Sequence, residues 1–333
     1  MYHIYAQGQI TSSIDMLPPK IKVDRGRAID VFNQLGPIPR LCIDNLGSLT
    51  RMKRYEEDVQ TAIKTLKLSR LEQLIEDTSS LTMDTLSHKI CLISRQDRED
   101  VYSRAVVSPI TSYIKSRLAN HFRTLEHRDQ IRLYKYFSKV PESRTVGGIF
   151  FEAAAQRCFQ RGMNVEFIPM VRPASSTSGK PRWHSSHVVF PNDAELEHSR
   201  QQALQNQQLL IIPEGLDIVE YTKNGPSSPI ISNVIYVPES TNQVALDSFI
   251  IMNNLLYIFQ FTIGGEHKVK TGLIDFVRRY PELPSMDNWR FIFILPPDHE
   301  LLCPQPRNLE MQVLQPYSAV IDLDKWHLGR QTS

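Results

Sequence analysis

The chain has 333 residues, of which 41% are hydrophobic and 22% are charged. This composition is typical of a soluble globular protein that is long enough for about two domains. The formal net charge is only +2, which excludes a strong overall positive field as a source of affinity for nucleic acid. Any such affinity must come from a local basic patch.

The chain contains four cysteines that lie far apart and share no zinc-binding spacing: Cys42, Cys91, Cys158 and Cys303. Their apolar surroundings predict reduced, buried thiols and therefore an intracellular protein. The N-terminal sequence has neither the charged start nor the apolar run of a signal peptide. Asn253 and Asn254 interrupt the longest apolar stretch, so we expect no membrane-spanning segment.

Residues 1–140 are predicted to form a helical region. From about residue 26, apolar residues recur at helical spacing, as in the stretches at 70–81 and 110–137, with charged residues between them. Gly36, Pro37 and Pro39 interrupt this pattern because glycine and proline disfavour a continuous helix.

Residues 141–333 are predicted to be mainly β-sheet, which makes the whole chain an α+β protein. Segments rich in β-branched and aromatic residues occur at 165–171, 187–190, 209–221, 233–237, 244–252, 255–263 and 289–295. Two helices are expected among them, at 193–208 and at 266–280, the second beginning after Gly265. A serine-rich loop at 172–187 adds basic residues.

The segments at 244–252 and 255–263 are predicted to form a hairpin. Asn253 and Asn254 both tolerate positive φ, so a two-residue turn there pairs Met252 with Leu255 and sets Asp247 opposite Gln260. By alternation, one face of the second strand carries Leu256, Ile258, Gln260 and Thr262, and the other carries Tyr257, Phe259, Phe261 and Ile263.

Asp247 and Gln260 could therefore share one cation at the polar end of this hairpin. Mg²⁺ prefers oxygen ligands and usually takes one or two carboxylates from the protein. The alternative is structural: Asp247 ends its strand by a hydrogen bond to a loop, and Gln260 satisfies a backbone group.

Glu152 is a third candidate ligand. The stretch at 147–159 reads as a helix, and within it Glu152 lies among Phe150, Phe151, Ala154 and Ala155. A carboxylate in such apolar surroundings needs a role, which could be to bind a metal ion or water. The alternative is a surface glutamate on an amphipathic helix.

Three stretches carry a resemblance to a known family: GGIFFEAAAQ, VIYVPESTNQVALDSF and LYIFQFTIGGEHKVKTGL. They resemble the C-terminal nuclease domain of the Crinkler and RHS-type effector proteins of fungi and other eukaryotes. The resemblance covers residues 145–295 and implies a PD-(D/E)xK, or restriction-endonuclease-like, fold with a central mixed sheet flanked by helices. Residues 26–46 and the helices that follow resemble the tail of the NTPase module that precedes this nuclease in the family.

The resemblance implies a DNase that depends on Mg²⁺ or Mn²⁺ and acts in the nucleus, with Glu152, Asp247 and Gln260 as the metal ligands. The NTPase core of the family is not expected, because the chain has no GxxxxGK[ST] motif. The stretch GGEHKVKT only imitates that motif, with Val269 where the second glycine is required. We therefore expect no binding of ATP, and we find no N-terminal delivery region of the family's type.

The chain departs from the family's pattern at Gln260, which stands for an acidic residue, and at Thr262, which stands where a nuclease of this fold carries lysine. The helix expected after Gly265 offers a replacement. At 100° per residue it would turn Lys270 inward, set His267 at the rim and point Lys268 away. The alternative is that Lys270 reaches past the apolar edge to solvent.

DNA is the expected partner, and no membrane association is expected. The residues that could follow its backbone are Lys268, Lys270, Arg278 and Arg279, together with Lys180 and Arg182 of the loop. The alternative for these residues is an ordinary solvated surface. Thr262 also supports a second function, that of a catalytically weakened nuclease fold that binds DNA or a protein without cutting. A third alternative is a regulatory or self-recognition protein. The sequence does not indicate the oligomeric state.

Overall fold

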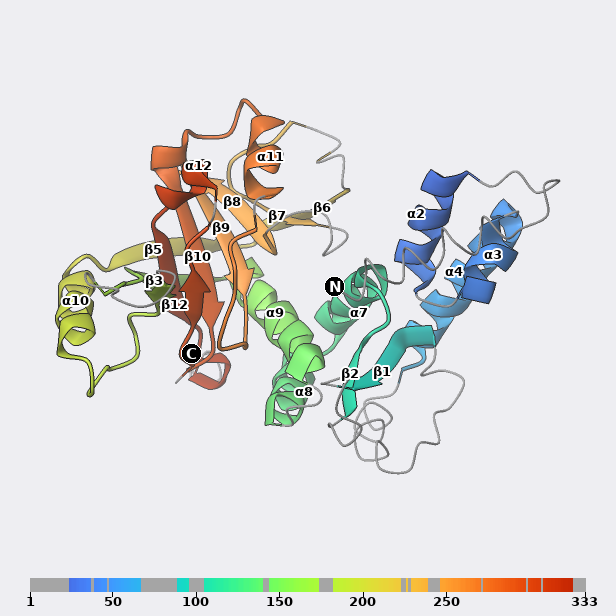
Figure 1. Cartoon of the computed structure of the whole chain (residues 1–333), viewed down its shortest axis with the longest axis horizontal. Coiled ribbons are helices and arrows are strands. Elements are labelled where there is room, and N and C mark those ends of the chain that lie inside the picture. Colours follow the sequence, from blue (N-terminus) through green and yellow to red (C-terminus); the bar gives the residue numbers. More distant parts are fainter. Residues whose placement is uncertain are drawn as a thin grey trace. The chain divides into compact units, whose positions relative to one another are not determined.

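The structure is a computed structural model, shown in Figure 1. It describes residues 24–36, 39–46, 48–66, 89–95, 105–139, 144–173, 182–222, 226, 229–238, 246–270, 272–297, 299–306 and 308–325. Two compact units are present, Met1–Thr124 with Lys139–Val146, and Leu125–Ser138 with Gly147–Ser333. We call them the N-terminal unit and the C-terminal unit and describe each by itself.

The N-terminal unit contains helices α2 (Arg25–Leu35), α3 (Pro39–Leu46), α4 (Leu49–Lys64) and α7 (Ser112–Thr124), and strands β1 (Cys91–Arg95) and β2 (Ala105–Pro109). Helix α2 ends where predicted, because Gly36 has a φ of 99° and its N–H donates to Phe32 O. The antiparallel pair β1–β2 was not predicted within this helical region. The predicted helical stretch at 70–81 lies outside the described residues.

The C-terminal unit begins with helices α8 (His127–Lys139) and α9 (Arg144–Gln160). Helix α8, which lies before residue 140, thus groups with the sheet rather than with the preceding helices. Further elements are β3 (Arg161–Pro169), β4 (Arg182–His184), α10 (Ala194–Gln205), β5 (Gln208–Glu214), β6 (Asp217–Tyr221), β7 (Val234–Pro238), β8 (Ser248–Met252), β9 (Leu255–Phe261), α11 (Gly272–Arg278), η3 (Met286–Asn288), β10 (Trp289–Leu295), β11 (Leu302–Pro304), α12 (Leu309–Gln312) and β12 (Pro316–Val320).

In the described part of the chain, the C-terminal unit is built on one mixed sheet with the strand order β5-β3-β12-β10-β9-β8-β7-β6. Strands β6 and β7, β9 and β10, and β10 and β12 pair in parallel, whereas the other neighbours are antiparallel. The predicted α+β class is therefore confirmed. The predicted strand at 187–190 is wrong, since these residues form a turn and irregular structure, and β12 was not predicted.

The hairpin of β8 and β9 has the predicted register. Met252 pairs with Leu255, and Ser248 pairs with Phe259. The turn residues Asn253 and Asn254 have φ values of 51° and 60°, as a two-residue turn of the favoured hairpin type requires. Asp247 lies one residue before β8, and its N–H continues the ladder by donating to Phe259 O at 3.0 Å.

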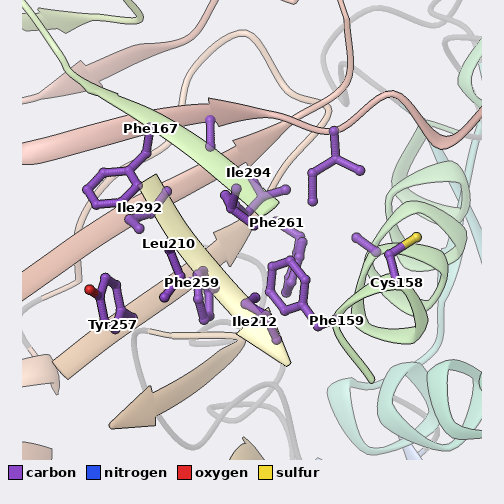
Figure 2. Close-up of a cluster of buried hydrophobic side chains, with 14 of the residues drawn as sticks. Cys158, Phe159, Phe167, Leu210, Ile212, Tyr257, Phe259, Phe261, Ile292 and Ile294 are labelled. Atoms are coloured by element: carbon purple, nitrogen blue, oxygen red, sulfur yellow. The ribbon is translucent and has the colours of Figure 1, made fainter. Parts of the chain in front are cut away.

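The two faces of the sheet bury two separate sets of side chains, as the alternation along β9 predicts. Tyr257, Phe259 and Phe261 belong to one set, which also includes Phe159 of α9, and we call it the α9-side core. Figure 2 shows Phe159 and Cys158 of α9 beside these strand residues. Leu256 and Ile258 belong to the other set, the α11-side core, which also includes residues of α11. Gln260 and Thr262, by their place in the alternation, belong to the α11 side.

The helix predicted to begin after Gly265 begins at Gly272. Residues 266–270 are not helical, and we call them the extended segment because they begin with strand-like pairing. Glu266 bridges Leu302 in parallel, and His267 N donates to Leu302 O at 3.0 Å. This backbone pairing with β11 keeps the segment from entering the helix.

Candidate functional site

Asp247 and Gln260 meet at the end of the β8–β9 hairpin. The Gln260 amide Nε2 donates a hydrogen bond to Asp247 Oδ2, and Phe261 N donates to the same oxygen at 2.8 Å. Gln260 is only 7% exposed, so its amide needs a partner, and Asp247 supplies one. The predicted proximity of the two side chains is confirmed.

Thr262 directly follows β9 and, by the alternation along the strand, lies on the same side of the sheet. Its N–H donates to Ile294 O at 3.1 Å, and its hydroxyl accepts from Gly264 N at 3.1 Å. The side chain is 7% exposed and closes the turn that follows the strand. At this position, where the resemblance led us to expect lysine, the chain therefore has a hydroxyl that caps a loop.

His267 lies near this site through an aromatic contact. Its ring is centred 5.8 Å from the ring of Phe293, and Phe293 is the residue of β10 that pairs with Gln260. His267 is half-buried, so the extended segment brings it close to the α11 side of the sheet beside Gln260.

A row of side chains crosses the sheet at the level of Asp247. Tyr236 of β7 pairs with Phe249 of β8, so two residues further along this antiparallel pair Pro238 lies opposite Asp247. Pro238 in turn pairs with Tyr221 at the end of β6. In the other direction the row continues through Gln260 to Phe293. Tyr221 and Phe293 both belong to the α11-side core, so the row shares one face.

Glu152 lies at the same end of the sheet but on the opposite face. Two contacts show how α9 lies along β9. A Cβ atom at Gly148 would lie 3.8 Å from Ile263, and the rings of Phe159 and Phe259 have centres 4.8 Å apart. Glu152 is one helical turn beyond Gly148 on the same stripe, and it therefore lies alongside the last residues of β9. It is 6% exposed on the α9 side, whereas Gln260 projects to the α11 side.

Lys270 does not point inward. The expected helical phase is wrong because the segment is extended, and an extended chain alternates with a period of two. Val269 is 8% exposed, whereas Lys268 and Lys270 on either side of it are both exposed to solvent. Both lysines are therefore exposed, and burial does not set Lys270 apart from Lys268.

The other basic candidates are distributed over the surface of the C-terminal unit. Arg182 lies 3.8 Å from Glu266, and Arg278 forms an ion pair with Glu310 at 2.7 Å. Arg279 is exposed at the end of α11. Lys180 lies outside the described residues.

The oxygen atoms of Asp247 and Gln260 are of the kind that a hard divalent cation prefers. As placed, the amide presents its N–H to the carboxylate; a 180° rotation about its terminal bond presents the oxygen instead. The pair therefore fits such a cation, with one carboxylate to hold it. Among the described residues, no group of three or more His, Cys, Asp or Glu side chains could hold a metal ion.

Two groups at this site were missed by reasoning from the sequence. The backbone N–H of Phe261 donates to Asp247, which the facing positions of the hairpin could have suggested. Tyr221 joins the row through the parallel pairing of β6 with β7, and no local sequence pattern indicates that pairing.

No protein-family model, no curated protein and no solved structure matches the chain. Among the helices that the structure describes, none is both long and apolar enough to cross a membrane.

Proposed function

We propose that the C-terminal unit is a nuclease that cleaves DNA with the help of Mg²⁺ or Mn²⁺. The observation that carries the proposal is the contact between Asp247 and Gln260 at one end of the sheet. The order of elements supports it: β7, β8 and β9 form an antiparallel meander, and α11 connects β9 to the parallel strand β10. This order is compatible with the restriction-endonuclease-like fold that the sequence resembles.

The site residues would have the following roles. Asp247 and Gln260 would hold the cation, whereas Glu152 projects from the opposite face of the sheet and is not part of this pair. A divalent cation bound there supplies charge neutralisation and an activated water for attack on a phosphodiester. His267, whose ring contacts Phe293 of the row, would contact a phosphate oxygen of the DNA. Lys268 and Lys270 would bind the DNA backbone from solvent.

A DNA substrate implies that the protein acts in the nucleus. Because the formal net charge is only +2, affinity for DNA would come from local contacts with basic residues. Lys268 and Lys270 project from one side of the same extended segment, and among the described residues neither forms an ion pair. They are free to neutralise phosphates, which is the main contribution to affinity for DNA without sequence preference.

A second candidate is a nuclease fold that binds DNA or a protein without cutting. Two observations favour it: the Gln260 amide donates to Asp247 rather than offering its oxygen, and Thr262 caps a loop where lysine is expected. An internal hydrogen bond can replace a cation as the partner of a carboxylate.

The test is cleavage of supercoiled plasmid DNA by the full chain with Mg²⁺, with Mn²⁺ and with a chelator. Asp247→Ala is the informative variant, and Asp275→Ala is its control, because Asp275 is an exposed carboxylate on α11 of the same unit. We expect the wild type and Asp275→Ala to nick the plasmid only with a divalent cation. Asp247→Ala should lose activity by at least about 100-fold, because the only carboxylate of the pair is gone.

Binding of the plasmid without nicking, unchanged by a chelator, would favour the second candidate. Full cleavage by Asp247→Ala would reject this assignment of the metal site. Correct folding of both variants is checked by their circular dichroism and melting temperatures.

A further inference from the structure

Tyr221 is a buried phenol whose hydroxyl group is not explained by the packing of the core. The residue is 2% exposed, and its ring contacts Phe249 and Phe276, each with ring centres 5.8 Å apart. Within the described part of the chain the hydroxyl has no hydrogen-bond partner. A buried hydroxyl without a partner is costly, so phenylalanine would serve better here if packing were the only role.

The nearest anionic group to this hydroxyl in the row is Asp247. Tyr221 and Asp247 are separated by Pro238 of β7, on the same face and at the same level of the sheet. Burial raises the pKa of Tyr221 well above its usual value, and the neighbouring Tyr280 and Asp247 raise this pKa further. The phenol therefore stays protonated at neutral pH and keeps an O–H to donate toward the carboxylate.

We infer that Tyr221 is a positioning residue for Asp247, to which its hydroxyl donates through an ordered water. Buried waters usually contact about three polar groups, and Tyr280 and Asp247 are the charged or polar neighbours that interact electrostatically with Tyr221. The inference rests on the proposed function, in which Asp247 is a metal ligand. Residues that hydrogen-bond to a metal ligand fix its orientation and increase its affinity for the metal.

The neighbouring strand offers a matched control. Tyr236 on β7 is also buried, at 1% exposure, and stacks on the same Phe249, but its hydroxyl accepts a hydrogen bond from Ile231 N at 2.9 Å. The same substitution, tyrosine to phenylalanine, therefore removes a hydroxyl with a known partner at 236 and the hydroxyl under test at 221.

The experiment compares melting temperatures of Tyr221→Phe and Tyr236→Phe in the wild-type and Asp247→Ala backgrounds. We expect Tyr221→Phe to lower the melting temperature by about 2 to 4 °C in the wild type, and to leave it unchanged or raise it in Asp247→Ala, where the phenol has lost its acceptor. Tyr236→Phe should lower it equally in every background. If Tyr221→Phe raises the melting temperature of the wild type, or changes it equally in the wild type and in Asp247→Ala, the inference is wrong.

Titration with Mn²⁺ adds a second measurement. Tyr221→Phe should weaken Mn²⁺ binding about 10-fold, whereas Tyr236→Phe should leave it unchanged. If the wild type binds no Mn²⁺, the proposed cation site fails, and the melting temperatures alone decide whether Tyr221 is coupled to Asp247. Equal Mn²⁺ affinity of Tyr221→Phe and the wild type would overturn the positioning role.

Discussion

Asp247 shows how a single carboxylate is fixed by its neighbours in a hairpin. Both donors to Oδ2 come from facing positions of β9, one from the side chain of Gln260 and one from the backbone of Phe261. Each donor stabilises the charged form of the carboxylate. The same arrangement that satisfies Asp247 without a cation would also orient it toward one, and only the direction of the Gln260 amide distinguishes the two states.

Gln156 of α9 gives a prediction about stability. Its side chain is fully buried, and among the described residues neither amide atom has a hydrogen-bond partner. Gln156→Met keeps the volume and removes both polar atoms, so we expect the free energy of unfolding to rise by about 1 to 3 kcal/mol. The measurement is urea denaturation of the full chain.

Gln130→Met is the control for this prediction. Gln130 is also fully buried, but its Oε1 lies 3.3 Å from His127 Nδ1. Removing that contact should lower the free energy of unfolding by about 1 kcal/mol. A loss of stability in Gln156→Met as large as in Gln130→Met would mean that the Gln156 amide has a partner after all.

At the scale of elements, the β8–β9 hairpin was the most predictable part of the candidate site. Its turn residues and its alternation are local features, and together they fix the register that brings Asp247 to Gln260. The segment after Gly265 was not predictable in the same way. Val269, Leu273 and Phe276 have spacings compatible with one helix, but Glu266 and His267 pair with Leu302, which is distant in sequence.

The hairpin turn yields a prediction at this scale. Asn254 has a φ of 60°, a conformation that asparagine and glycine adopt more easily than alanine. Asn254→Ala should therefore lower the free energy of unfolding by about 1 kcal/mol, and Asn254→Gly should change it little. Equal denaturation midpoints for the two variants would show that the turn does not depend on positive φ.

The extended segment at 266–270 yields another prediction. Because Lys268 and Lys270 are both exposed on it, each should contribute one phosphate contact to DNA binding. Lys268→Ala and Lys270→Ala should each weaken binding severalfold, and each should reduce the slope of log affinity against log salt by about 0.9. Fluorescence anisotropy with a labelled duplex at several salt concentrations measures both quantities.

Lys325→Ala is the control for these two variants, since Lys325 lies 3.4 Å from Asp322 and its charge is already balanced. It should leave the slope unchanged. If Lys270→Ala abolishes cleavage while Lys268→Ala does not, the lysines are not equivalent, and a catalytic role for Lys270 returns.

At the scale of the whole molecule, the sequence contains no phosphate-binding loop of the P-loop type. The motif GxxxxGK[ST] is absent from all 333 residues. We therefore expect no saturable binding of ATP at micromolar concentrations, measured by calorimetry with Mg²⁺ present. Binding in that range would show that the N-terminal unit holds a nucleotide by other means.

The general plan of the molecule was predictable, but its long-range pairings were not. Helical spacing before residue 140 and β-rich segments after it indicated the α+β class. The place of Tyr221 in one row with Asp247 depends on a parallel pairing of β6 with β7, and β12, although late in the sequence, lies in the middle of the sheet. Contacts of this kind are decided by packing between distant segments, for which the local sequence has no signal.

The central claim is that Asp247 and Gln260 hold a divalent cation, and the most direct measurement is a crystal structure with Mn²⁺ and its anomalous scattering map. We predict a peak beside an Asp247 carboxylate oxygen, with the Gln260 amide rotated so that its oxygen faces the ion. A map without a peak at Asp247 at saturating Mn²⁺, with Gln260 Nε2 still donating to Asp247, would contradict the claim and leave a hydrogen-bonded pair in place of a metal site.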